Sequence, residues 1–135
     1  MTLTIQDFGK SNAAQFASSV SIAIPASPSS VKLAEFGLSV FSSGQVVLGA
    51  TVGTQATLGQ PDILYSILRG VTVIYTVKAS DLQSSKFDEA AFTYTDSGVA
   101  NGYYAYSISA EITNSIATNQ ANVIGPIAFS GISLL

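Results

Sequence analysis

The chain has 135 residues, which is enough for one domain with a hydrophobic core of its own. It contains no cysteine and no histidine, and this excludes disulfide frameworks, metal sites built from these residues and every catalytic mechanism that depends on them. Only 10% of the residues are charged and the net charge is -3, so the surface offers no basic patch for nucleic acid or for an anionic membrane.

The first segment, residues 1–17, is polar and irregular and is dotted with Leu3, Ile5 and Phe8. We interpret it as an extended N-terminal arm that precedes a single domain at residues 18–135. A polar arm with a few apolar side chains suits the addition of a strand to a neighbouring molecule. We therefore expect these three apolar residues to take part in assembly.

The rest of the chain predicts an all-β domain, because β-branched and aromatic residues are frequent and no apolar stripe persists at helical spacing. Short β-rich runs are separated by clusters of Gly, Pro, Ser and Asn, which is typical of a sandwich. The expected strands span residues 20–24, 31–41, 45–52, 63–68, 71–77, 87–95, 103–112 and 123–135. They predict an eight-stranded antiparallel sandwich of the jelly-roll type.

Two of these strands give the clearest local signal. Residues 63–68 and 71–77 are joined by Arg69 and Gly70, which predicts a β-hairpin. By contrast, the stretch Gly53–Pro61 is too polar for a central strand, and we interpret it as a surface loop or an edge excursion. Residues Thr113–Asn122 form a second polar loop.

The strand at 103–112 alternates most regularly, with Tyr104, Tyr106 and Ile108 on one face. We expect this face to lie in the core or in a subunit interface. The alternative is a stacking platform of tyrosines for a glycan or for bases.

Acidic and hydroxyl groups give only weak candidates for a site. Asp88 and Glu89 are adjacent on a predicted strand and point to opposite faces, so they are not expected to share a substrate. Asp96, Ser97 and Asn101 offer oxygen ligands for calcium, but ordinary turn chemistry explains them as well.

Arg69 lies at the tip of the predicted hairpin and is the chain's single arginine. It is either a solvated turn residue or one half of an ion pair between subunits, with a carboxylate such as Asp62.

Three stretches resemble a known family. Val46–Gly53, Gly59–Gly70 followed by Val73–Tyr75, and Val123–Gly131 are similar to the exosporium protein C type of spore-surface protein from endospore-forming bacteria. This resemblance implies a fold like the trimeric jelly-roll heads of spore collagen-like fibres, although the Gly-X-Y stalk is absent here. It also implies synthesis in the mother-cell cytoplasm, deposition on the spore surface, and contacts with other spore-coat or exosporium proteins.

Taken together, these observations predict a non-catalytic structural protein, without cofactor or metal, that assembles with copies of itself as a trimer or a filament. The alternative is a module that binds a glycan or a coat protein through the two polar loops. No apolar run approaches the length of a membrane helix, and Met1–Asp7 lacks the basic start of a signal peptide. We expect no membrane or nucleic-acid partner.

Overall fold

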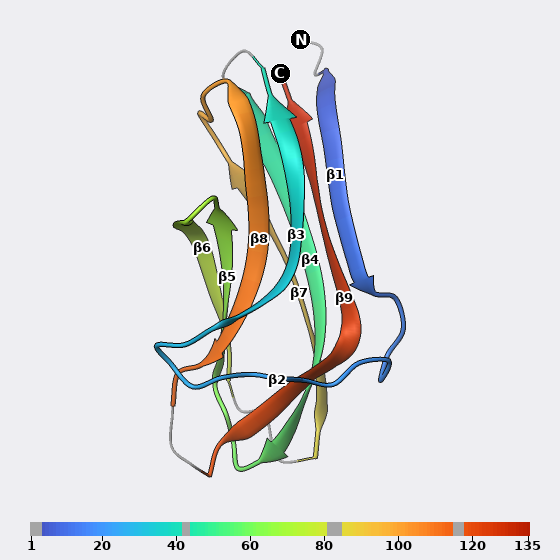
Figure 1. Ribbon diagram of the computed structural model, residues 1–135, viewed down its shortest axis with the longest axis vertical. Helices are drawn as coiled ribbons and strands as arrows, with labels where there is room; N and C mark the ends of the chain where they lie inside the picture. The colour runs from blue at the N-terminus through green and yellow to red at the C-terminus, as the bar shows by residue number, and fades with distance from the viewer. Residues whose placement is uncertain (1–3, 42–43, 81–84, 115–117) are drawn as a thin grey trace.

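The computed structural model describes residues 4–41, 44–80, 85–114 and 118–135 of the chain. These residues form nine β-strands and no helix (Figure 1), which confirms the all-β prediction. The strands are β1 (Ile5–Ala14), β2 (Ile22–Ala23), β3 (Val31–Val40), β4 (Gln45–Leu58), β5 (Ile63–Arg69), β6 (Thr72–Ala79), β7 (Phe87–Asp96), β8 (Gly102–Ile112) and β9 (Gln120–Leu134). The described part of the chain thus holds no helix that could span a membrane.

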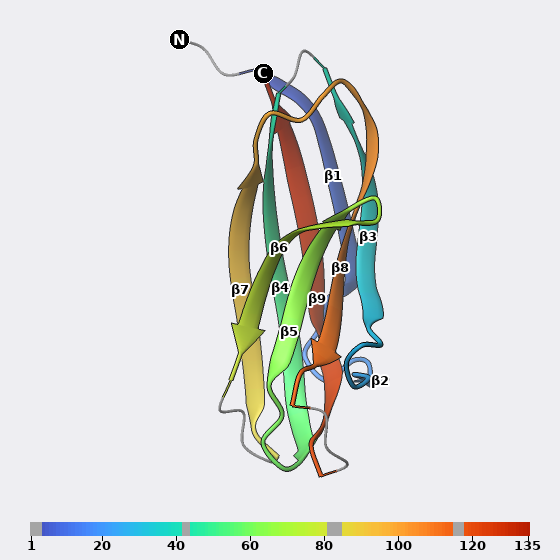
Figure 2. The ribbon, with the colours of Figure 1, turned by 90° about the vertical axis from the view of Figure 1, so that its left-hand side faces the viewer.

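Two antiparallel sheets face each other across one core, as the view in Figure 2 shows. The larger sheet has the strand order β1-β9-β4-β7, and β2 pairs with β9 beyond the end of β1. The smaller sheet has the order β3-β8-β5-β6. This interleaving of distant strands is the order of a jelly roll, so the predicted fold is confirmed, with nine strands rather than eight.

The segment interpreted as an arm belongs to the larger sheet of its own chain. β1 pairs antiparallel with β9, from Ile5 opposite Leu134 to Ala14 opposite Ile127. The prediction of an N-terminal arm is therefore wrong for residues 5–14. These residues belong to the domain that was expected to begin at residue 18. The predicted strand at 20–24 shrinks to the two residues of β2.

Side chains of β1 also bind the neighbouring edge of the smaller sheet. Asp7 Oδ2 accepts a hydrogen bond of 2.8 Å from the backbone N–H of Ser39 in β3. Gln6 Oε1 accepts one from the N–H of Phe41, and Gln6 Nε2 donates to the carbonyl oxygen of the same residue. These bonds close one side of the sandwich between β1 and β3.

β4 is longer than the sequence indicated. It continues from Gly53 to Leu58, where it pairs with β9 on one side and in part with β7 on the other. Thr54 and Ala56 are buried in this stretch. The loop prediction for Gly53–Pro61 is therefore wrong as far as Leu58, because small and hydroxylated residues occupy a crowded central strand there.

The hairpin prediction is confirmed by β5 and β6. Ile63 pairs with Ala79 at the open end and Arg69 with Thr72 at the tip. Gly70 has φ +64°, a left-handed conformation that glycine adopts without steric cost.

The core lies between the sheets and contains the inward face of β8. Tyr106 and Ile108 are fully buried, whereas Tyr104 is only partly covered. Phe36 of β3 packs between the rings of Tyr106 and Phe129, at centroid distances of 6.0 and 4.8 Å. The tyrosine face of β8 is thus a core face at these two positions.

A pH-dependent stability is expected from Tyr65, which is buried near Thr54. Neither hydroxyl completes a hydrogen bond within the described residues. Burial raises the pKa of Tyr65 from 10.0 to about 12, although the nearby Thr54 hydroxyl opposes part of the rise. The folded chain holds this proton more tightly than the unfolded chain, so the stabilisation is complete below pH 10 and is lost as the pH rises towards 12.

We expect Tyr65 alone to lower the free energy of unfolding by about 1.4 kcal/mol per pH unit over that interval. Urea unfolding between neutral pH and pH 11 measures the slope, and Tyr65→Phe should reduce it by that amount. The exposed Tyr103→Phe serves as the matched control. Equal slopes for Tyr65→Phe and the original chain would contradict the prediction.

Candidate contact face

The outward face of the larger sheet is built from alternate residues of β1, β9, β4 and β7. Burial alternates strictly along β9, so that every second side chain points away from the core. In the middle of this face the outward residues are small or carry a hydroxyl group. We define the contact face as Phe8, Lys10 and Asn12 of β1, Ala128 and Ser130 of β9, Gly49 and Thr51 of β4, and Ala91 and Thr93 of β7.

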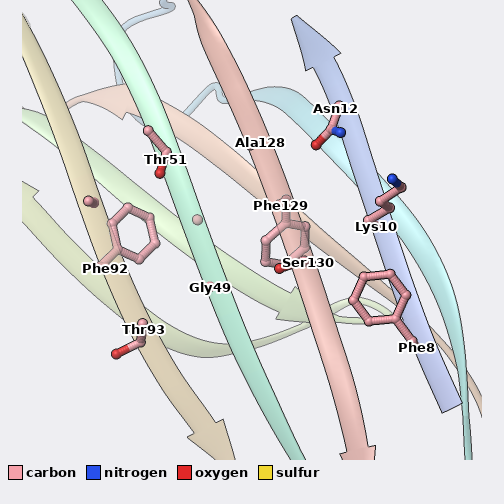
Figure 3. Close-up of a pocket in the computed structure, with 12 residues that line it drawn as sticks. Phe8, Lys10, Asn12, Gly49, Thr51, Phe92, Thr93, Ala128, Phe129 and Ser130 are labelled. Atoms are coloured by element: carbon pink, nitrogen blue, oxygen red, sulfur yellow. The ribbon is translucent and has the colours of Figure 1, made fainter. Parts of the chain in front are cut away.

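The contact face is hollowed, as Figure 3 shows. A shallow depression of about 590 Å³ is lined by residues of all four strands. Phe8 and Lys10 border it on the β1 side, and the short side chains of β9, β4 and β7 leave its middle open. The backbone of the sheet is therefore accessible to another surface at close range.

An apolar row runs across the same sheet beside the depression. Phe8 lies opposite Ile132, and Ile132 lies opposite Val47 on the next strand. Phe8 is 54% exposed and Val47 36% exposed. Contiguous apolar groups of this kind on a surface mark sites of interaction.

The charges and hydrogen-bonding groups of the contact face indicate which kind of partner it can bind. Lys10 is its one charged member, and the hydroxyl groups of Thr51, Thr93 and Ser130 can each donate and accept hydrogen bonds. Such a face suits a flat, mostly uncharged partner, because little charge must be stripped of water on contact.

The predicted assembly residues have different fates. Leu3 lies outside the described residues. Ile5 is exposed at the start of β1, and Phe8 belongs to the contact face. Tyr106 and Ile108, which were expected in the core or in a subunit interface, lie in the core.

Arg69 is neither a solvated turn residue nor a partner of Asp62. Its Nη1 lies 2.5 Å from Oδ2 of Asp96, whose side chain is 7% exposed. The hydroxyl of Tyr106 donates a hydrogen bond of 3.0 Å to the same oxygen. Asp62 instead faces Lys78 at 3.8 Å. Arg69 therefore joins β5 to β7 within one chain.

These contacts perturb the proton affinity of the groups that make them. The hydrogen bond to Asp96 raises the pKa of Arg69. Burial raises the pKa of Tyr106, and the hydrogen bond to the Asp96 carboxylate adds to the rise. Arg69 therefore stays charged and Tyr106 stays protonated at neutral pH, as expected for a structural ion pair.

The acidic candidates do not form a common site. Oδ2 of the buried Asp96 carboxylate is bound by Arg69 and Tyr106, which gives this side chain a structural role within the chain. Within the described residues, acidic side chains nowhere gather in groups of three that could hold a metal. Asp88 and Glu89 are successive residues of an edge strand, β7.

The two stretches predicted to be binding loops contact each other. The backbone N–H of Asp62 donates to Asn114 Oδ1 at 2.7 Å, and Asn114 Nδ2 donates to the carbonyl oxygen of Gln60 at 2.9 Å. Asn119 Oδ1 accepts from the N–H of Gln60. These amide groups are used within the chain to hold one end of the sandwich together.

Sequence reasoning missed the contact face itself. Its members are small and come from four separate segments, which only the sheet order brings together. One local signal was present, since Gly49 and Thr51 alternate with buried apolar residues in β4. That signal shows which way the residues point but not which strands flank them.

Comparison with known proteins adds information at the level of fold. No protein-family model matches the chain, and a search of curated proteins gives no match. Among solved structures, it is similar to infectious bursal disease virus of the Gt strain, with a TM-score of 0.62 and 11% identity over 96% of this chain and 37% of that one. The fold is shared, but the sequence is not.

Two further solved structures show the same likeness. One is the T13 viral particle of IBDV, with a TM-score of 0.58, 10% identity, and coverage of 96% of this chain and 31% of that one. The other is the T=1 particles derived from infectious bursal virus, with a TM-score of 0.58, 10% identity, and coverage of 98% and 37%. The chain thus spans about a third of the length of the solved chains that it resembles.

Proposed function

We propose that this protein is a structural subunit that packs against copies of itself in a surface layer, and that the contact face is one of its interfaces. The observation that carries this proposal is the hollowed outer face of the larger sheet, which presents small residues from β9, β4 and β7 and an apolar row across β1, β9 and β4. A free monomer relies on surface charge for solubility. This face has one charged residue.

The fold supports the proposal. Jelly rolls are compact units whose flat faces and edges can be covered by neighbours, and the solved chains of similar fold come from virus particles. The similarity extends to the fold alone, so the geometry of packing in those particles is not carried over to this chain.

The endospore surface is the location that we propose for this layer. It rests on the resemblance of Val46–Gly53, Gly59–Gly70 and Val123–Gly131 to spore-surface proteins. Gold-labelled antibody on sections of sporulating cells tests it. Label on the outer spore layers supports the location, and label confined to the cytoplasm of vegetative cells contradicts it.

The alternative function, binding of a glycan or coat protein through the polar loops, has less support from the geometry. Asn114 and Asn119 already bond to the backbone at residues 60 and 62.

Self-assembly is tested by a charge placed in the middle of the contact face. We expect Thr51→Glu to abolish assembly, because a carboxylate there must lose its water against an uncharged surface. Thr76→Glu is the matched control, since Thr76 is an exposed residue of β6 in the other sheet. Sedimentation and negative-stain microscopy should show assemblies for the original chain and the control.

Circular dichroism establishes that Thr51→Glu remains folded. Assembly of Thr51→Glu at the same concentrations as the original chain would exclude this face as an interface. A chain that stays monomeric at every attainable concentration would overturn the proposed function as a whole.

A further inference from the structure

Two charged side chains stand on the outward face of the larger sheet, at opposite edges. Lys10 is an outward residue of the edge strand β1, and Glu89 is an outward residue of the other edge strand, β7. Lys10 borders the depression in the contact face, and Glu89 lines the neighbouring hollow along the same sheet. Neither takes part in an ion pair within the part of the chain that the structure describes.

The strand register places these two charges on a diagonal. Lys10 lies in a row with Ser130 and Gly49, and Glu89 lies opposite Gly53. Gly49 and Gly53 are four residues apart on β4, so the outward residue midway between the two rows is Thr51, which pairs with Ala128. The pair of Thr51 and Ala128 therefore marks the midpoint between the positive and the negative charge.

We propose that two copies of the chain pack through this face about a twofold axis at Thr51 and Ala128, with Lys10 of each copy paired with Glu89 of the other. This inference rests on the proposed function and specifies its interface. A twofold contact requires a self-complementary surface, in which residue i meets residue j and residue j meets residue i. One cation and one anion, equally far from a common midpoint, meet that requirement.

The rest of the face agrees with such a contact. Small residues at the midpoint allow the two sheets to approach, and the depression leaves room for ordered water that the threonine and serine hydroxyls can bind. Because the charges lie on a diagonal, the strands of the two copies cross at a steep angle, which is one of the two ways in which sheets pack face to face.

The outward face of the larger sheet is large enough for a stable interface between two copies. Four strands spaced about 4.8 Å apart, each about ten residues long at about 3.3 Å per residue, give a projected area of about 630 Å². A standard interface buries about 800 Å² of accessible surface per partner, and accessible surface exceeds projected area on a hollowed face. The apolar row of Phe8, Ile132 and Val47 lies inside this area.

Charge reversal tests the pairing. Because a twofold contact contains two Lys10–Glu89 pairs, Lys10→Glu or Glu89→Lys alone turns both of them into pairs of like charge. We expect each single variant to weaken self-association about tenfold or more. The double variant should restore the original affinity. An equimolar mixture of the two single variants should also associate. One variant carries an anion at both positions and the other a cation at both, so opposite charges face each other in both pairs of the mixed dimer. Sedimentation equilibrium measures all four samples.

A second measurement locates the axis. The chain has no cysteine, so Thr51→Cys introduces a unique thiol, which a short bis-maleimide should crosslink into dimers. Thr76→Cys, on the other sheet, should not be crosslinked by the same reagent.

The outcomes separate this inference from the proposed function. Single variants that associate like the original chain, or a mixture that fails to associate, overturn the twofold pairing while self-assembly stands. An original chain that remains monomeric overturns both.

Discussion

Arg69→Leu is expected to lower the free energy of unfolding by about 3 kcal/mol, because it leaves the Asp96 carboxylate buried without its cation. Asp96 is almost fully enclosed, with a side chain that is 7% exposed, whereas the side chain of Arg69 is 30% exposed. The partial exposure of the arginine places the cost at the lower end of the range for buried pairs. Urea unfolding at neutral pH measures it.

The partner variant separates the ion pair from other effects. Asp96→Asn keeps the size of the side chain and a hydrogen-bond acceptor for Tyr106, so it should cost less than Arg69→Leu. In the double variant no unpaired carboxylate remains, and its loss of stability should be clearly smaller than the sum of the two single losses. Additive losses would show that the pair does not stabilise the fold as a unit.

Gly53→Ala is expected to cost about 3 kcal/mol or to prevent folding, because there is no space for the added carbon atom. A Cβ at this position would lie 2.1 Å from the carbonyl oxygen of Gly125, which is backbone on the adjacent strand β9 and cannot move aside. The two central strands of the larger sheet would have to separate.

The same strand provides the control. Gly49 also lies on the outward face of β4, yet a Cβ there would meet only the Thr93 methyl group at an ordinary 3.9 Å. We expect Gly49→Ala to change the free energy of unfolding by less than about 0.5 kcal/mol. Denaturation at low protein concentration, where self-association is suppressed, should be used for both variants. Similar losses for the two would contradict the steric argument.

Local patterns predicted the parts of the fold that local chemistry determines. The hairpin of β5 and β6 has β-rich runs on both sides of Gly70, and β8 has the most regular alternation of side chains in the chain, so both were found from the sequence. The jelly-roll class followed from the spacing of such strands.

β1 and the second half of β4 escaped prediction for a shared reason. In β1, the buried residues are Gly9 and Ala14, so the strand has no apolar stripe for a pattern to reveal. In β4, Thr54 and Ala56 are small or polar, although they lie in the core. Both stretches are strands because β9 pairs with them, and the residues of neither stretch alone indicate this pairing.

The candidate site shows the same division. The sequence indicated a surface poor in charge, and the assembly role that it indicated for Phe8 stays a prediction, whereas it gave Arg69 the wrong partner. Asp96 is 27 residues further along the chain, and nothing near Arg69 points to it. The contact face and its two diagonal charges depend on the order of four strands, which is a property of the whole fold.

The pairing of β1 with β9 also sets the order of events during synthesis. Gln6 and its partner Ser133 are 127 residues apart, and translation at about 5–20 residues per second separates their appearance by about 6–25 s. Throughout that interval β1 has no β9 of its own to pair with, and Phe8 has no sheet to lie on. The sandwich can close only after β9 has been made, so its folding depends on the slow, long-range pairing of β1 with β9.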